Sequence, residues 1–131
     1  METHDGEVAT VGLSDAERSS VADAIPASSV SVVAADALPD RATTLAAVVV
    51  AHDPPETDAV ATVRAVRDAD ATVPIVCVAD GDESLAADVV AAGADRYVPR
   101  SRGPEALATA VADAVAVGND RRERRLESEI L

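Results

Sequence analysis

The sequence contains no lysine, no Phe and no Trp, and Tyr97 is its only aromatic residue. Without large aromatic rings, the core has to be built from Val, Ala, Leu and Ile. Buried strands made of such residues are typical of parallel sheets covered by helices on both faces. All 11 basic residues are arginine and 24 residues are acidic, so the net charge is −13. That balance disfavours binding to nucleic acid, which relies on clustered cations.

Cysteine and long apolar runs are also scarce. Cys77 is the only cysteine, which excludes an internal disulfide and is typical of a reducing compartment. It lies in the apolar run PIVCVA, so we expect a buried, unreactive thiol. The sequence has neither an apolar stretch of membrane-spanning length nor a signal peptide. We therefore expect a cytoplasmic domain that does not interact with membranes.

The many Asp and Ala residues, together with the missing lysine, are typical of halophilic proteins. Salt screens the repulsion between carboxylates, while the carboxylates keep the surface hydrated. The alternative is an ordinary acidic domain from a low-salt cell. The absence of lysine favours salt adaptation.

Short valine-rich runs alternate with longer alanine-rich segments of helical period. A chain of 131 residues fits one domain. The alternation predicts an α/β fold, a doubly wound five-stranded parallel sheet of order 2-1-3-4-5. The predicted strands are Val8–Leu13, Val30–Ala34, Ala47–His52, Pro74–Ala79 and Asp95–Val98, and the predicted helices are 14–25, Asp40–Leu45, one through Val60, Val63 and Val66, Asp82–Gly93 and one from Pro104.

The two ends of the chain differ from this pattern. Residues 1–7 are polar and are expected to be disordered, so the domain spans 8–117. Residues 118–131 are predicted to be a helical extension or the start of a linker to a further domain. The arginines of this extension are interleaved with Glu, so they do not predict a nucleic-acid patch.

Four segments at the ends of predicted strands, VGLSD, VVVAHDPP, PIVCVAD and GADRYVPRS, resemble the receiver domains of response regulators. The resemblance extends over about 8–117. It implies a flavodoxin-like receiver fold and a role in phosphorelay signal transduction by a two-component system. The fifth-strand segment of that family reads Gly-Ala-x-x-Tyr-x-x-Lys-Pro. In this chain, Arg100 replaces the lysine and Ser101 replaces the proline.

The resemblance also implies where the active positions of a receiver would fall. The acidic pair that holds Mg²⁺ corresponds to Ser14 and Asp15, and the aromatic residue that reports phosphorylation corresponds to Tyr97. Ala51 stands at the phosphoacceptor position, and Ala79 stands where the family has Thr or Ser. Only Asp15 among the five pocket equivalents keeps the residue type of the family.

These replacements remove the chemistry of phosphoryl transfer. Transfer to an aspartate needs a carboxylate nucleophile, a divalent cation and donors directed at the developing charge. Asp15 alone would hold Mg²⁺ weakly, because this ion usually takes one or two carboxylates together with a phosphate. The fork of Arg100 is not equivalent to the point charge of a lysine. We therefore expect a degenerate receiver, or pseudo-receiver, that is not an enzyme and has no cofactor.

Two other interpretations stay open. Asp53 lies two residues beyond Ala51 and would be the phosphoacceptor of an active, divergent response regulator, although Pro54 restricts its backbone. Alternatively, the vacated pocket would bind a small anion or other ligand in a sensor. His52 lies at the same edge, where we expect a histidine without a chemical role.

The expected partners are proteins, either a histidine kinase or an attached output domain. Receivers commonly pair through the face formed by the fourth helix, the fifth strand and the fifth helix. Leu126, Ile130 and Leu131 follow this face at helical spacing. The sequence therefore also predicts a homodimer in which two outgoing helices are aligned.

Overall fold

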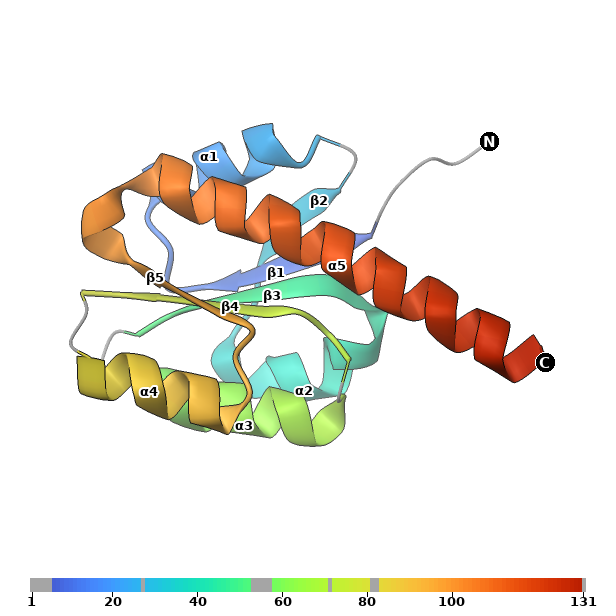
Figure 1. Cartoon of the computed structure of the whole chain (residues 1–131). Coiled ribbons are helices and arrows are strands. Elements are labelled where there is room, and N and C mark those ends of the chain that lie inside the picture. Colours follow the sequence, from blue (N-terminus) through green and yellow to red (C-terminus); the bar gives the residue numbers. More distant parts are fainter. Residues whose placement is uncertain (1–5, 27, 53–57, 71, 81–82, 131) are drawn as a thin grey trace.

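The structure, a computed structural model, describes residues 6–26, 28–52, 58–70, 72–80 and 83–130, with the backbone alone for 119–130. Five parallel strands form one sheet in the order β2-β1-β3-β4-β5 (Figure 1). This confirms the predicted fold class. The strands are β1 Glu7–Val11, β2 Ser29–Val32, β3 Leu45–Ala51, β4 Ile75–Ala79 and β5 Arg96–Pro99.

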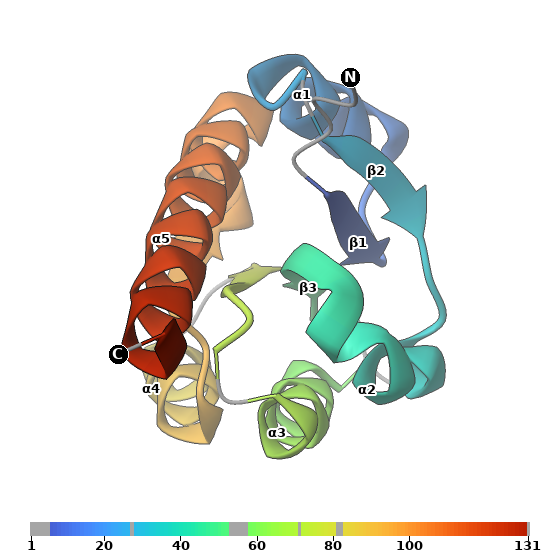
Figure 2. The same ribbon diagram turned by 90° about the vertical axis from the view of Figure 1, so that its right-hand side faces the viewer.

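Helices cover both faces of the sheet (Figure 2). One face carries α1 (Asp15–Ala24) and α5 (Pro104–Ile130), which pack against each other. The opposite face carries α2 (Leu38–Arg41), α3 (Ala59–Ala69) and α4 (Glu83–Ala92). None of the described helices is long and apolar enough to cross a lipid bilayer.

Small apolar side chains fill the core on both sides of the sheet. All seven residues of β3 are buried. Successive residues of a strand point to opposite faces, so Val49 packs beneath α1 and α5 while Val48 and Val50 pack on the other side. Cys77 lies in the apolar layer that also contains Val48 and Val50, and its burial raises the pKa of its thiol to about 12. Small aliphatic side chains are therefore enough to fill the space between the sheet and the helices, without aromatic rings.

The predicted short helix Asp40–Leu45 is wrong in its bounds. Two 3₁₀ turns, Ala35–Ala37 and Ala42–Thr44, flank the four-residue α2. Pro39 lies in the first turn of α2, where its missing N–H has no helical partner to lose. Leu45 is extended and buried and pairs with Glu7 in the sheet, because an apolar residue next to a buried strand gains more as part of that strand.

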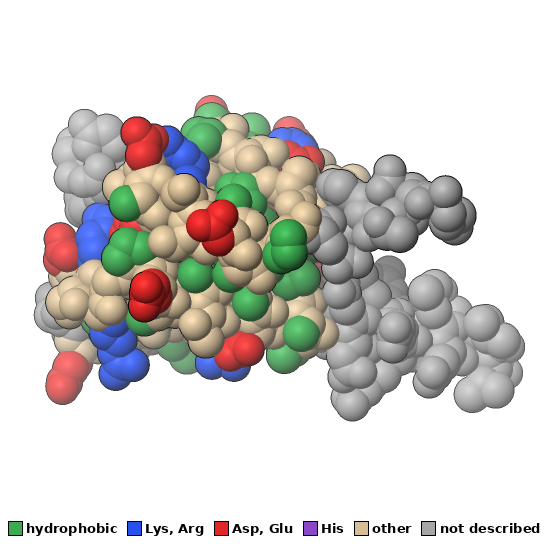
Figure 3. All heavy atoms as spheres, turned by 90° about the horizontal axis from the view of Figure 1, so that it is seen from above, with side chains coloured by type: hydrophobic (Ala, Val, Ile, Leu, Met, Phe, Trp, Pro, Cys, Tyr) green, Lys and Arg blue, Asp and Glu red, His purple; other side chains and the backbone are tan. Residues whose placement is uncertain are grey.

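Helix α5 is continuous over 27 residues and leaves the domain beyond Gly118. A Cβ atom at Gly118 would lie 2.6 Å from the Cγ atom of Pro74, so glycine permits the close approach of α5 to the start of β4. The face formed by α1 and α5 shows acidic side chains spread among small apolar ones (Figure 3). The acidic side chains on this face contribute to the strong net negative charge of the chain.

Candidate functional site at the carboxyl edge of the sheet

Ligands of open parallel sheets bind beyond the carboxyl ends of the strands. In this structure, Ala51 ends β3 and Ala79 ends β4, and their exposed fractions are 0% and 1%. Gly12 follows β1 with a φ of +78°, and a Cβ atom on it would lie 3.2 Å from the Cβ of Ala51. The turn after β1 is therefore packed closely against the position where a receiver would carry its phosphoacceptor.

Ser14 and Asp15, the predicted acidic-pair equivalents, begin α1. Ser14 is the N-cap residue, and its Oγ accepts a hydrogen bond of 3.2 Å from the backbone N–H of Glu17. The Glu17 carboxylate accepts one of 2.8 Å from the Ser14 N–H, which completes a capping box. Asp15 pairs with Arg18, and its side chain is 96% exposed.

The geometry at Asp15 bears on Mg²⁺ binding. Within the described residues, no group of three or more His, Cys, Asp or Glu side chains is placed to hold a metal ion. A single exposed carboxylate that already pairs with Arg18 does not fit the oxygen ligand set that Mg²⁺ prefers. Weak Mg²⁺ binding at Asp15 stays a prediction.

Arg100, the lysine equivalent, forms a two-pronged ion pair with Glu17. Its Nε donates to Oε2 of Glu17 at 2.9 Å and its Nη2 donates to Oε1 at 3.2 Å. The Glu17 side chain is 7% exposed and that of Arg100 is 31% exposed. Two parallel hydrogen bonds between a guanidinium and a carboxylate are the strong form of this contact. The ion pair therefore joins the start of α1 to the end of β5.

The pKa of Glu17 reflects two opposing effects. Burial raises it, while the hydrogen bonds from Arg100 and Ser14 and the positive charge of Arg100 lower it. The lowering effects prevail, so the pKa of Glu17 lies below its ordinary value and the carboxylate is ionised at neutral pH.

Glu17 is a residue of this site that was not predicted from the sequence. The pattern Ser-x-x-Glu from Ser14 to Glu17 indicates a capping box, so the local role of Glu17 could have been predicted from the sequence. Its contact with Arg100 joins residues 83 positions apart, and no local pattern encodes it.

A shallow pocket of about 440 Å³ lies beside this ion pair. Its lining includes Gly12, Leu13, Ser14, Glu17, Arg100 and Pro104. The guanidinium at its edge already has an anionic partner. An added anion would therefore have to displace the Glu17 carboxylate or share Arg100 with it.

His52 has a structural contact at the same edge. Its Nδ1 accepts a hydrogen bond of 3.1 Å from the N–H of Ala59, the first residue of α3. The backbone N–H of His52 donates to the carbonyl of Val78 at 2.9 Å. These contacts give His52 a structural role at this edge, and the absence of a chemical role stays a prediction. Asp53, the alternative phosphoacceptor, lies outside the described residues.

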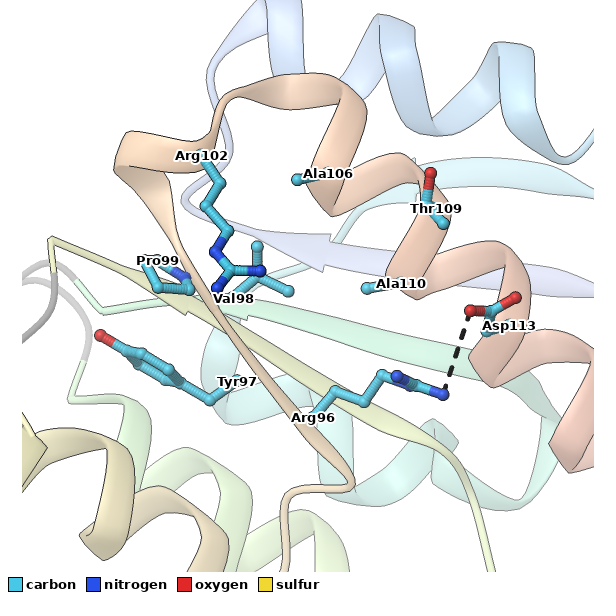
Figure 4. Close-up of a pocket in the computed structure, with 9 residues that line it drawn as sticks. All are labelled: Arg96, Tyr97, Val98, Pro99, Arg102, Ala106, Thr109, Ala110 and Asp113. Carbon is cyan, nitrogen blue, oxygen red and sulfur yellow. Dashed lines mark ion pairs between the residues drawn. The ribbon is translucent and has the colours of Figure 1, made fainter.

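Tyr97, the predicted switch aromatic, is half-buried on β5. Its ring packs against the apolar layer on the α3 and α4 side, and its hydroxyl oxygen is buried. Figure 4 shows the ring directed away from α5. Ala79 offers no hydroxyl for a hydrogen bond to this tyrosine.

Comparison with protein-family models and with curated protein sequences gives no match, whereas solved structures do match. The BeF₃-activated receiver domain of DrrB superposes with a TM-score of 0.70 at 17% identity, covering 85% of this chain and 97% of that one. A two-component response regulator of the LuxR family from Aurantimonas sp. gives a TM-score of 0.68 at 20% identity, over 92% of this chain and 98% of its own.

A third match is a fusion that contains the trimeric coiled coil of yeast Spc42. Its TM-score is 0.70 at 18% identity, and it covers 99% of this chain and 95% of its own. Together with the strand order, the two response-regulator matches show that this chain has the receiver-domain fold.

Proposed function

We propose that this chain is a degenerate receiver of two-component-type signal transduction, which acts through protein contacts without phosphorylation of an aspartate and without enzymatic activity. The ion pair between Arg100 and Glu17 is the main support. We also propose that the module works in a salt-rich cytoplasm, which the acidic, lysine-free composition supports.

The physical argument concerns the cation. A donor that stabilises a phosphoryl group has to be available for the charge that develops in the transition state. Arg100 instead donates to a buried carboxylate of its own chain, so the ion pair would have to break before Arg100 could act. Ala51 adds no nucleophile and is completely buried.

The test is incubation with acetyl phosphate and Mg²⁺ in molar KCl, followed by intact mass measurement. We expect no phosphate adduct, under conditions in which an active receiver domain becomes labelled. An adduct that disappears in Asp53→Ala but persists in Asp80→Ala would establish an active response regulator instead. Asp80 is a suitable control because it is an exposed aspartate at the end of β4.

The small-anion sensor receives less support, because Glu17 already occupies the cation of the pocket. Titration with inorganic phosphate or sulfate, followed by NMR of the backbone amides at Gly12 and Leu13, tests it. Saturable shifts at millimolar anion would favour the sensor over the pseudo-receiver.

Protein partners follow from the proposed role, either a histidine kinase or an attached output domain. The homodimer through the α4-β5-α5 face stays a prediction. The unbroken run of α5 to Ile130 is compatible with paired outgoing helices.

Light scattering in molar KCl on the chain with and without residues 119–131 tests the homodimer. We expect a dimer for the full chain and a weaker one for the shortened chain. A monomer in both samples at high concentration would refute it.

A further inference from the structure

β2 forms the edge of the sheet opposite β5, and Figure 2 shows it beside β1 at this edge. The backbone N–H of Val33, directly after β2, donates to the carbonyl of Thr10 on β1 at 3.0 Å. Because alternate residues of a strand direct their N–H and C=O groups to opposite sides, those of Val30 and Val32 are directed away from β1. The outer side of β2 therefore presents the backbone donors and acceptors of both residues to an added strand.

The two edges of the sheet differ in how they are protected. Edge strands of native proteins commonly carry a charge, a proline or a bulge that hinders pairing with another chain. β5 carries the exposed Arg96 together with Pro99, whereas β2 reads Ser-Val-Ser-Val and pairs with β1 in a regular register. Val32 is 69% exposed, more than any other large apolar side chain that the structure describes. The described residues of β2 therefore carry none of the features that keep another strand away.

The charge around this edge differs from that of the chain as a whole. No residue between Asp23 and Asp36 is charged, in a sequence in which 27% of the residues are charged and the net charge is −13. An acidic segment would be repelled by the rest of the surface, and a basic segment would find no carboxylate on β2 itself. At molar salt the attraction between exposed charges is also screened beyond about 3 Å. The edge therefore fits an uncharged partner that binds through backbone and apolar contacts.

Side-chain contacts on the inner side hold β2 in place. Oγ1 of Thr10 donates to the carbonyl of Ser31 at 2.9 Å, and Oγ of Ser31 donates to the carboxylate of Glu7. Arg41 pairs with the same carboxylate. Val30 packs against the apolar layer beneath α1 and α5. Because the strand is already fixed in an extended form, the ordering cost of adding a segment to it is reduced.

We propose that the outer edge of β2 binds an uncharged extended segment of another protein, which adds to the sheet as a further strand. The segment exchanges backbone hydrogen bonds with Val30 and Val32, and one of its β-branched side chains packs on Val32. The inference names the chemistry of a partner and rests in that respect on the proposed function. It does not depend on whether an aspartate of this chain is phosphorylated.

A second copy of the chain is the other occupant that an open edge admits. The homodimer predicted above lies at the α4-β5-α5 face, so it leaves β2 open and is compatible with this proposal. Pairing of two β2 strands would join two whole domains through four residues each, which is far less than the roughly 1,200 Å² that stable complexes bury. A single segment brings no second charged domain to the edge, and it needs only the weak, transient contact that is common in signalling.

The probe is the peptide acetyl-Thr-Val-Thr-Val-Thr-amide, titrated into the ¹⁵N-labelled full chain in molar KCl and followed by backbone amide shifts. We expect saturable shifts at millimolar peptide, larger at Val30 and Val32 than at Ser31 and Val33, whose N–H groups face β1. The same peptide methylated on every backbone nitrogen keeps its side chains but has no backbone N–H donors, and it should produce no shifts. Doubling the KCl concentration should leave the affinity unchanged, because the contact contains no charge pair.

Two variants at one position separate backbone pairing from simple attraction to an apolar side chain. Val32→Pro removes the outward N–H, which an edge strand tolerates, and should weaken binding by about fivefold or more. Val32→Thr keeps the N–H and the β-branched shape, so it should change the affinity by less than about twofold. Circular dichroism and the amide shift of Val33 show whether β2 still pairs with β1. Where Val32→Pro does not fold, Val32→Lys takes its place, since a charge on an edge strand hinders pairing.

Any one of several results would overturn the proposal. These are no saturable shifts at Val30 and Val32, equal shifts with the methylated peptide, loss of binding at doubled KCl, equal affinities of Val32→Pro and Val32→Thr, and shifts of the β2 amides with protein concentration alone. The last would show that a second copy occupies the edge. None of them bears on the acetyl phosphate experiment, so failure here is distinguishable from failure of the proposed function.

Discussion

Replacing Glu17 with alanine should be the most informative single perturbation of this domain. The carboxylate has two roles, since it accepts the N–H of Ser14 in the capping box and both donors of Arg100. Alanine removes both. Glutamine keeps a side chain that can close the capping box but removes the negative charge. Comparison of the two variants therefore separates the cap from the ion pair.

The magnitude follows from the burial of the two partners. Removing one member of a fully buried ion pair costs about 3–5 kcal/mol, because the other charge is left uncompensated. Arg100 is 31% exposed, so water compensates part of its charge and we expect about 2 kcal/mol from the ion pair. Loss of the cap adds about 0.5 kcal/mol. For a chain of this length, the sum of about 2.5 kcal/mol lowers Tm by about 10 °C.

The assay is thermal and urea unfolding followed by circular dichroism in molar KCl. Glu17→Gln should lose about 1.5 kcal/mol of unfolding free energy, less than the alanine variant. Asp15→Asn is the matched control, since it removes a carboxylate from the same helix start that is 96% exposed, and its melt should coincide with that of the wild type. A double-mutant cycle with Arg100→Gln measures the coupling between the two side chains.

The reasoning would be refuted if Glu17→Ala melted together with Asp15→Asn. A coupling energy below about 0.5 kcal/mol would also refute it, because it would mean that Glu17 and Arg100 act independently. In that case the support for the proposed function from this ion pair would disappear as well.

Four further outcomes are expected. Because the folded-state pKa of Glu17 is lowered, its carboxylate stabilises the fold above pH 4.5, and this stability is lost as the pH falls through the lowered pKa. The difference in unfolding free energy between wild type and Glu17→Gln should therefore shrink in acid. A difference that stays constant with pH would contradict this. Gly118→Ala should lower Tm, because the added methyl group would lie 2.6 Å from Pro74. Overpacking of this kind costs about 1–3 kcal/mol, which exceeds the gain of about 1 kcal/mol in helix propensity. A raised Tm would show that α5 can shift away from Pro74. Cys77, with a pKa of about 12, should not react with a disulfide reagent at pH 8 until urea unfolds the chain, and rapid labelling of the folded protein would place the thiol at the surface. Melts in low and in molar KCl should show Tm rising with salt, because salt screens the net charge of −13, and equal midpoints would argue against salt adaptation.

The sheet could be predicted from sequence because its signal is local. The run AVVVA of β3 is apolar at every position, as expected for a strand covered on both faces, and the structure buries all of it. Pro74 and Gly93 likewise marked the approach to β4 and the end of α4. The short helix was misplaced because four helical residues between two 3₁₀ turns carry no periodicity that sequence reasoning can detect.

The candidate site could be predicted only in part. Arg100 was identified from its segment, but which anion it meets depends on how α1 lies against β5, and that is a tertiary property. The surroundings of Asp15 also could not be predicted from the sequence. Residues two positions apart on a helix point in different directions, so Asp15 is directed to Arg18 and solvent while Glu17 is buried.

The close packing of Gly12 on Ala51 affects how such a chain can change in evolution. Aspartate at position 51 would put a carboxylate in a fully buried position beneath the turn after β1, where a Cβ atom on residue 12 would already lie 3.2 Å from the methyl group of Ala51. An unpaired buried charge costs several kcal/mol, and Arg100 could neutralise it only by leaving Glu17. No single substitution at position 51 therefore provides a working phosphoacceptor. Under the proposed function, a working phosphoacceptor at position 51 would need the turn after β1, the Glu17 carboxylate and its pairing with Arg100 to change together.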